Sequence, residues 1–146
     1  LALACDLVIA TESAVFLQAF TRIGLIPDAG GTSFLPRRVG LQRAMGAALL
    51  AEPVSARQAE AWGMIWEAVP DEQFAAVVTA RAAKLAAGPT GAYAALKQAL
   101  RSAFEQPLEA QLAVEARLQG QCGASEDFRE GVAAFLEKRS PRFTGR

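Results

Sequence analysis

One acidic residue, Asp28, lies in a segment whose composition suits a binding or catalytic site. Pro27 precedes it and stiffens the approach, because the proline ring fixes φ. Gly30 and Gly31 follow it, and a backbone without side chains can come close to a ligand. We therefore consider two roles for Asp28: a cap for the helix that the sequence predicts next, or a carboxylate that transfers protons.

The surroundings of Asp28 do not decide between these two roles. The N-terminus of a helix would hold the carboxylate ionised, which suits a cap better than a base. The apolar neighbours Phe20, Leu25 and Ile26 would act in the opposite direction by desolvating it. Both interpretations stay open on these residues alone.

Other common catalytic chemistries are excluded by missing residue types. The 146 residues include no histidine, so they offer no Ser-His-Asp or Cys-His nucleophile. They also lack the commonest zinc and haem ligand. The two cysteines, Cys5 and Cys122, are too few for a disulfide framework and have no metal-site spacing. We expect both to be buried, reduced thiols of a cytoplasmic protein, and we expect no bound metal.

The first half of the chain is predicted to contain short strands. Apolar runs at 7–9, 15–17 and 64–69 are typical of strands, and residues 1–5 predict the last turn of a buried helix. Trp66, in the third run, is expected in the core.

Short helices are predicted between these strands. A loop rich in glycine and proline, 23–32, leads into helices predicted at 33–39 and 41–51. Ser55, followed three residues later by Gln58, is a capping box that predicts a further short helix.

After residue 69 the sequence predicts only helices, three or four of them. Their apolar residues recur at helical spacing, and Ser125 is the predicted N-cap of the last helix. The segments expected to separate these helices are Gly88-Pro89, Gln106-Pro107 and Gly120–Gly123. The chain therefore divides into an α/β part, 1–69, and a helical part, 70–146, whose apolar faces need a partner.

The charge of the chain is balanced. Fifteen basic and fifteen acidic residues give no net charge, so neither nucleic acids nor anionic membranes are expected as partners. No uncharged stretch approaches the ~20 residues that a membrane helix needs. The chain opens in an apolar segment with neither a basic signal-peptide region nor a helix cap, so we expect further residues of the domain before Leu1.

Two motifs resemble the enoyl-CoA hydratase/isomerase (crotonase) superfamily. They are LALACDLVIA at 1–10 and GLIPDAGGT at 24–32, and the similarity continues through EGVAAFLEKR at 130–139. The resemblance covers essentially all 146 residues. It implies the C-terminal part of an α/β crotonase (ClpP-like) fold: a spiral core of ββα units at 1–69, followed by a helical trimerisation region at 70–146.

The resemblance also implies an enzyme that acts on acyl-CoA thioesters. Crotonases stabilise a thioester enolate with two backbone N–H groups, which would precede Leu1 here, and they move protons with carboxylates. They need no cofactor, since coenzyme A is part of the substrate. They assemble as homotrimers or as dimers of trimers.

Within the superfamily, the sequence is most similar to the branch of ring-1,2-epoxyphenylacetyl-CoA isomerases, which serve bacterial phenylacetate degradation. Ala61–Trp66 and Lys138–Gly145 carry this finer similarity. In hydratases a catalytic carboxylate occupies the position of Phe20, and a phenylalanine cannot transfer a proton. Asp28 matches the aspartate of the epoxide isomerases and dienoyl-CoA isomerases, so the resemblance implies that Asp28 is catalytic. The substrate-binding residues implied beside it are Phe20, Leu25 and Pro27.

Phe135 and Lys138 lie three residues apart on the last predicted helix. The residue types alone favour a core aromatic and a solvated cation. The matching residues of crotonases lie near the adenine or the phosphates of CoA, so the resemblance implies that both bind substrate. Together with Lys138, the cations Arg139, Arg142 and Arg146 form a basic cluster that could meet the phosphates.

Three other functions stay open beside epoxide isomerisation. They are aliphatic 3,2-enoyl-CoA isomerisation, enoyl-CoA hydration, and a catalytically silent role as an assembly subunit. Phe20 argues against hydration, and Asp28 argues against the silent subunit, because an idle subunit needs no carboxylate there. The balanced charge disfavours an RNA-binding crotonase.

Overall fold

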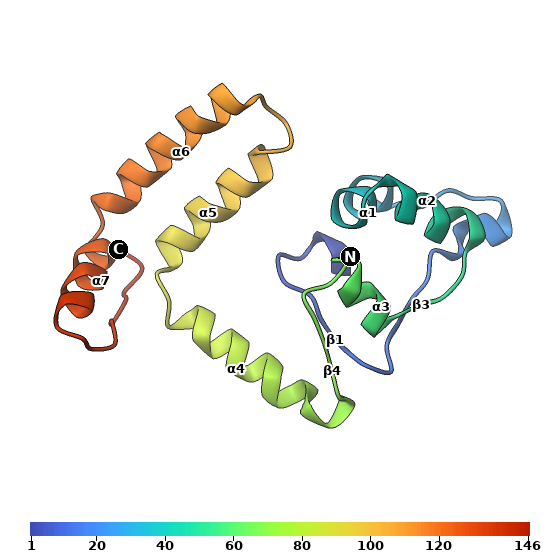
Figure 1. Ribbon diagram of the computed structural model, residues 1–146, viewed down its shortest axis with the longest axis horizontal. Helices are drawn as coiled ribbons and strands as arrows, with labels where there is room; N and C mark the ends of the chain where they lie inside the picture. The colour runs from blue at the N-terminus through green and yellow to red at the C-terminus, as the bar shows by residue number, and fades with distance from the viewer. The chain divides into compact units, whose positions relative to one another are not determined.

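The computed structural model describes residues 1–146 and divides into two compact units, Leu1–Thr79 and Ala80–Arg146 (Figure 1). Helix α4 (Phe74–Ala86) begins in the first unit and ends in the second. The assignment of 1–69 to a spiral core and 70–146 to a trimerisation region stays a prediction.

The first unit holds two small sheets of two strands each. Strand β1 (Ile9–Thr11) pairs in parallel with β4 (Glu67–Val69), with Ile9 opposite Glu67. Strand β2 (Val15–Phe16) pairs antiparallel with β3 (Val54–Ser55). The strands expected at 15–17 and 64–69 are present but shorter than their apolar runs. The strand expected at 7–9 is displaced, since β1 shares only Ile9 with that run. Each strand pairs with a segment distant in sequence.

Two consecutive helices follow the glycine-rich loop as predicted. Helix α1 (Gly31–Val39) includes Pro36 and ends at Gly40, whose φ of 79° is unfavourable for other residues. Helix α2 (Leu41–Leu50) begins directly after it. The Ser55 hydroxyl accepts the N–H of Gln58 at 3.2 Å, which confirms Ser55 as the N-cap of α3 (Ala56–Ala61).

The core of the first unit lies where these helices meet the strands. Ala56 and Ala59 of α3 are completely buried, because small side chains let α3 pack closely on its neighbours. The other buried members of this core are Ala10, Leu35, Val39, Ala44, Ala47, Val54, Met64, Ile65 and Ala68.

Three expectations of burial are wrong. Residues 1–5 form a short 3₁₀ helix, η1 (Ala2–Ala4), with no buried residue, and the Cys5 thiol is exposed because its segment lies on the surface. Cys122 is only half-buried. Trp66 precedes β4 and leaves 62% of its surface exposed, whereas its neighbours Met64 and Ile65 are buried in the core.

All regular secondary structure of the second unit is helical, as predicted for the tail. Helices α5 (Thr90–Ser102) and α6 (Leu108–Gly123) pack against each other as a hairpin, and α7 (Glu126–Leu136) contacts α6 (Figure 1). The buried amide of Gln111 ties this hairpin together by donating to the carbonyl of Ala99 at 3.0 Å.

The separation expected at Gly120–Gly123 is wrong, since α6 continues through these glycines and ends at Gly123. Backbone hydrogen bonds of the helix override the low helix propensity of glycine there. The Ser125 hydroxyl then caps α7 by accepting the N–H of Phe128 at 3.0 Å, as predicted.

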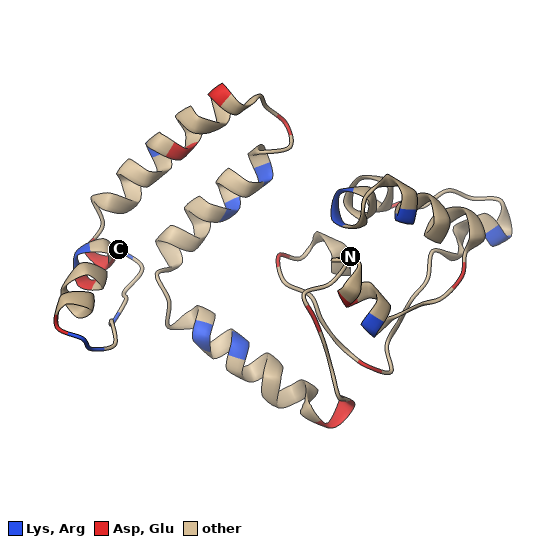
Figure 2. Cartoon of the chain, viewed as in Figure 1, with Lys and Arg blue, Asp and Glu red and all other residues tan.

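Charged residues of both signs are distributed along both units (Figure 2). Helix α5 carries only basic charges, Lys97 and Arg101, whereas α6 carries both signs. None of the helices combines the length and the apolar character that crossing a membrane requires.

Candidate functional site

Asp28 lies in a tight turn that leads into α1. The N–H of Gly31 donates to the Asp28 carbonyl at 2.7 Å and closes the turn. Ala29 and Gly30 both adopt the left-handed region, with φ of 48° and 81°. Two such residues in succession reverse the chain sharply, and the strain at Ala29 is of the kind that concentrates at functional sites.

Two side chains press on the glycines of this turn. A Cβ atom at Gly30 would lie 2.9 Å from Cε2 of Phe34, and one at Gly31 would lie 3.1 Å from Cβ of Pro27. A side chain at either position would therefore force Phe34 or Pro27 to shift, and the φ of 81° at Gly30 favours glycine in addition.

The Asp28 side chain is exposed, and no protein group hydrogen-bonds to its carboxylate. The N-cap of α1 is Gly30, and no side chain caps this helix. The interpretation of Asp28 as the cap is therefore wrong, because two left-handed residues separate it from the first residue of the helix and Gly30 takes the N-cap position. This side chain is available to contact a ligand.

The segment before Asp28 is anchored to α2. Thr21, in the 3₁₀ helix η2 (Ala19–Ile23), donates its hydroxyl to the Ala48 carbonyl at 2.9 Å, and Arg22 donates to the carbonyl of Ala51. The N–H of Leu25 donates to the Phe20 carbonyl at 3.0 Å, so these two candidate residues share one turn.

The residues that precede Asp28 along the chain are apolar, and several of them are exposed. Phe20 and Pro27 are half-buried, while Ile23, Leu25 and Ile26 are exposed. Apolar groups left in water at a prospective site are suited to contact an apolar part of a ligand. The substrate-binding roles of Phe20, Leu25 and Pro27 stay predictions.

Phe135 and Lys138 lie in the second unit, at the end of α7. Phe135 leaves 82% of its surface exposed, so it is not the core aromatic that residue type favours. It lines an apolar groove of about 590 Å³ together with Phe128, Val132 and Phe143. Lys138 is exposed and adopts a left-handed conformation, with φ of 54°.

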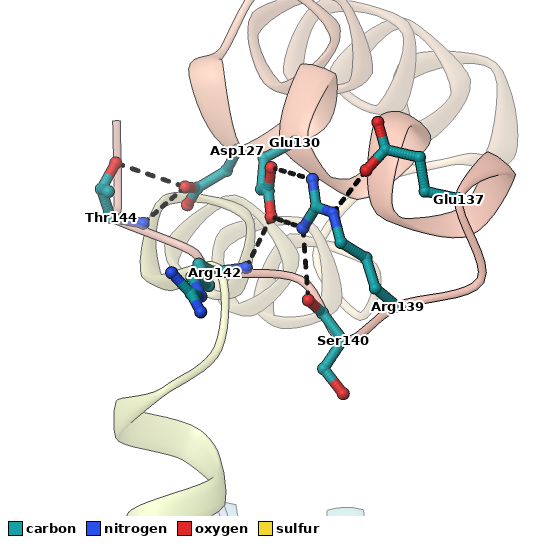
Figure 3. A network of polar contacts seen from close by, with 7 residues as sticks. All are labelled: Asp127, Glu130, Glu137, Arg139, Ser140, Arg142 and Thr144. Carbon is teal, nitrogen blue, oxygen red and sulfur yellow. Dashed lines mark hydrogen bonds and ion pairs between the residues drawn. The ribbon is translucent and has the colours of Figure 1, made fainter.

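The predicted basic cluster after α7 is only partly free to meet phosphates. The Arg139 guanidinium lies between Glu130 and Glu137 (Figure 3). Two of its nitrogens donate to the two oxygens of Glu130 at 2.6 and 2.9 Å, and Nε donates to Glu137 at 2.6 Å. Carboxylates of the same unit thus already occupy the donors of Arg139, and the contact of this cluster with phosphates stays a prediction.

Glu130 is the most strongly perturbed acid. Hydrogen bonds from the Arg139 side chain and from the Arg142 N–H lower the pKa of Glu130 to about 2, because both favour the ionised carboxylate. Asp71, in the first unit, is perturbed in the same direction: the hydroxyl and N–H of Ser13 lower the pKa of its carboxyl. Neither acid was singled out from the sequence.

No group of three or more potential metal ligands among histidine, cysteine, aspartate and glutamate comes together in the structure. The groups that the structure presents to ligands are instead one unpaired carboxylate with apolar neighbours and, separately, an exposed aromatic ring close in sequence to a lysine.

Comparison with known proteins decides the family. The model of the family described as "Enoyl-CoA hydratase/isomerase" matches residues 1–146. The chain belongs to the enoyl-CoA hydratase/isomerase family. This confirms the resemblance that the motifs at 1–10 and 24–32 indicate.

Two curated relatives in this family match the whole chain. A protein of Rhodobacter capsulatus named "Probable enoyl-CoA hydratase" is 64% identical, and the chain covers 57% of it. The "1,2-epoxyphenylacetyl-CoA isomerase" of Escherichia coli is 52% identical, and the chain covers 56% of it. The chain thus spans little more than half the length of these relatives.

The fold agrees with solved structures of the family. The enoyl-CoA hydratase of Bacillus anthracis is 33% identical and superposes with a TM-score of 0.94, over 99% of this chain and 56% of that one. This confirms the predicted α/β crotonase fold.

Proposed function

We propose that the protein is an acyl-CoA isomerase of the crotonase type, which converts ring-1,2-epoxyphenylacetyl-CoA to its oxepin isomer. The observation that supports this function most is the unpaired carboxylate of Asp28, which follows Pro27 in a strained turn. The resemblance to the epoxide isomerases implies the catalytic role of this position. The 52% identity to the Escherichia coli isomerase supports the same reaction.

Asp28 acts as the acid and base in the proposed reaction. Its carboxylate takes a proton from carbon near the thioester carbonyl and returns it at another position, so the isomer contains the same atoms and electrons as the substrate. Two backbone N–H groups stabilise the negative charge that develops on the thioester oxygen. The resemblance implies that both N–H donors belong to residues before Leu1.

The remaining predicted site residues bind substrate in this proposal. Phe20, Leu25 and Pro27 contact the acyl group, because they present apolar surface in the segment that leads to Asp28. Phe135 and Lys138 contact the adenine and the phosphates of CoA. The reaction needs no redox cofactor, since isomerisation transfers no net electrons, and CoA belongs to the substrate. The proposal assigns no role to a metal, because two N–H donors stabilise the charge.

Hydration of an enoyl-CoA is the second candidate function. The name of the Rhodobacter capsulatus relative, which is 64% identical, favours it. Phe20 disfavours it, because a two-carboxylate hydration needs an acid at that position and phenylalanine cannot supply a proton.

The substitution Asp28→Asn tests the role of the carboxylate in the full-length protein. We expect kcat for isomerisation to fall by about 10²-fold or more, because proton transfer by a positioned side chain contributes about 10²–10⁴-fold. Stability should hardly change, because the Asp28 side chain makes no hydrogen bond in the fold.

Glu52→Gln is the matched control, since Glu52 is an exposed carboxylate of the same unit outside the proposed site. It should leave kcat unchanged. The measurement is turnover of ring-1,2-epoxyphenylacetyl-CoA, a 3-enoyl-CoA and a 2-enoyl-CoA. An Asp28→Asn variant that keeps its kcat, or a wild-type protein that only hydrates the 2-enoyl-CoA, would refute the proposal.

A further inference from the structure

The last residues of the chain form a strap, residues 139–146, that folds back along α7. Two acids one helical turn apart hold it (Figure 3). Glu130 accepts the Arg139 guanidinium and, at 2.7 Å, the N–H of Arg142. Asp127, only 7% exposed, accepts the N–H groups of Thr144 and Gly145 at 2.7 and 2.9 Å.

The far end of the strap is fixed by packing within the same unit. The backbone N–H of Asp127 donates to the Arg146 carbonyl at 2.9 Å. A Cβ atom added at Gly145 would lie 2.5 Å from Oγ1 of Thr90, and one added at Gly131 would lie 3.6 Å from the ring of Phe143. The strap therefore contacts α7 and the start of α5.

Lys138 is the residue at which the chain turns from α7 into the strap. The N–H of Arg139 donates to the Ala134 carbonyl at 3.0 Å, and that of Lys138 donates to the Phe135 carbonyl at 3.3 Å. This pattern closes a helix with a left-handed residue, a position that favours glycine. The chain itself uses Gly24, with φ of 77°, to end η2, so a lysine with φ of 54° is a strained choice here.

The side chains of Lys138 and Arg139 differ in whether they have a partner. All three nitrogens of the Arg139 guanidinium donate to carboxylates, whereas the Lys138 ammonium has no partner. The backbone at Lys138 is thus strained, although the Lys138 side chain makes no hydrogen bond or ion pair within this unit. Strained residues of this kind concentrate where a protein binds a ligand.

From these contacts we infer that Glu130 is a positioning residue for the CoA part of the substrate. It acts by pinning Arg139 and Arg142, which fixes the left-handed turn at Lys138 and directs the ammonium of Lys138 toward the phosphates. Arg139 serves as the anchor of this turn and does not bind phosphate. The inference rests on the proposed function, because it takes acyl-CoA as the ligand of Lys138.

The test compares an acyl-CoA with the matching acyl-pantetheine, which lacks the nucleotide and its phosphates, in the full-length protein. Glu130→Gln should raise KM for the acyl-CoA by about tenfold, the order of one charge-assisted contact. It should leave kcat and the KM for the acyl-pantetheine unchanged. A merely structural role would affect both substrates alike.

A double-mutant cycle with Lys138→Ala shows whether Glu130 acts through this lysine. Lys138→Ala alone should raise KM for the acyl-CoA to a similar extent, and adding Glu130→Gln should raise it no further. Additive effects, or equal losses with both substrates, would overturn the inference.

The matched control is Glu137→Gln, which removes the other carboxylate from Arg139 but touches no backbone of the strap. It should leave both KM values unchanged. If Glu130→Gln does not fold, Arg139→Gln replaces it in the same cycle, because it removes the same ion pair from the other side.

A second measurement distinguishes failure of the proposed function from failure of the positioning role of Glu130. If the wild-type protein turns over none of the thioesters, binding of free CoA is titrated by calorimetry instead. Weaker binding to Glu130→Gln and Lys138→Ala, with non-additive losses, would still support the positioning role. Equal binding to all variants, or none to the wild type, would overturn it.

Discussion

At the scale of single residues, the turn that carries Asp28 depends on positions without a Cβ atom. Gly24 and Gly30 have nearly the same left-handed φ, 77° and 81°, but different surroundings. Nothing lies within 4 Å of a Cβ at Gly24, whereas a Cβ at Gly30 would meet the Phe34 ring at 2.9 Å. The two positions therefore separate the cost of backbone strain from the cost of a steric clash.

We expect Gly30→Ala to destabilise the protein more than Gly24→Ala. Gly24→Ala should lower the free energy of unfolding by about 1–2 kcal/mol, the cost of a left-handed alanine. Gly30→Ala should lower it by roughly a further 1–3 kcal/mol, because its methyl group overpacks against Phe34. It should also lower kcat, since the turn holds Asp28. Chemical denaturation of both variants measures the difference, and equal losses would mean that Phe34 moves aside freely.

At the scale of elements, α7 and the strap form one unit held by carboxylates. Glu130 is the acid that gives this unit a pH dependence, because its pKa is about 2 in the fold against an ordinary value of 4.5. The Arg139 guanidinium and the Arg142 N–H face it from the strap, and Glu137, just after α7, binds the same guanidinium. Its contribution to stability is complete above pH ~4.5 and is lost as the pH falls through about 2.

Hydrogen exchange at the Arg142 amide should report this loss. We expect protection of this amide to decrease as the pH falls from about 5 to about 2, because protonated Glu130 no longer attracts the guanidinium or accepts this N–H as strongly. Glu130→Gln should show low protection with little further change over the same range, after correction for intrinsic exchange. Equal pH dependence in both proteins would contradict the role of Glu130.

At the scale of the whole molecule, the helical unit exposes apolar residues that a partner would cover. Leu96 and Leu100 lie one turn apart on α5, and both are more than half exposed. Apolar stripes of this kind mark interaction surfaces, and the family resemblance implies that a homotrimer or a dimer of trimers covers them.

Light scattering of the full-length protein should give a mass of three or six chains. Leu100→Glu should shift the mass toward the monomer, because an unpaired charge buried in an apolar interface is costly. Gln98→Glu is the matched control, because Gln98 lies on the opposite side of α5 and should tolerate the same charge. A monomeric wild type, or an unchanged mass of Leu100→Glu, would contradict the prediction.

The features that depend on neighbouring residues along the chain could be predicted without the structure. Adjacent residues specify four such features, and the structure contains each of them: the caps at Ser55 and Ser125, the end of α1 at Gly40 and the glycine-rich turn at Asp28. The family could also be identified from the sequence, because its motifs are contiguous. Local signals suffice where a hydrogen bond or a backbone angle involves residues a few positions apart.

The features that join distant segments could not be predicted from the sequence and are known from the three-dimensional fold. The fold paired β1 with β4, left Trp66 exposed, and placed Glu130 against Arg139 and Arg142. It also separated Asp28 from the capping role that its sequence position suggests. In the distant pairings, the partner is chosen by packing and by competition among many similar residues, and such a choice is not encoded at any single position of the chain.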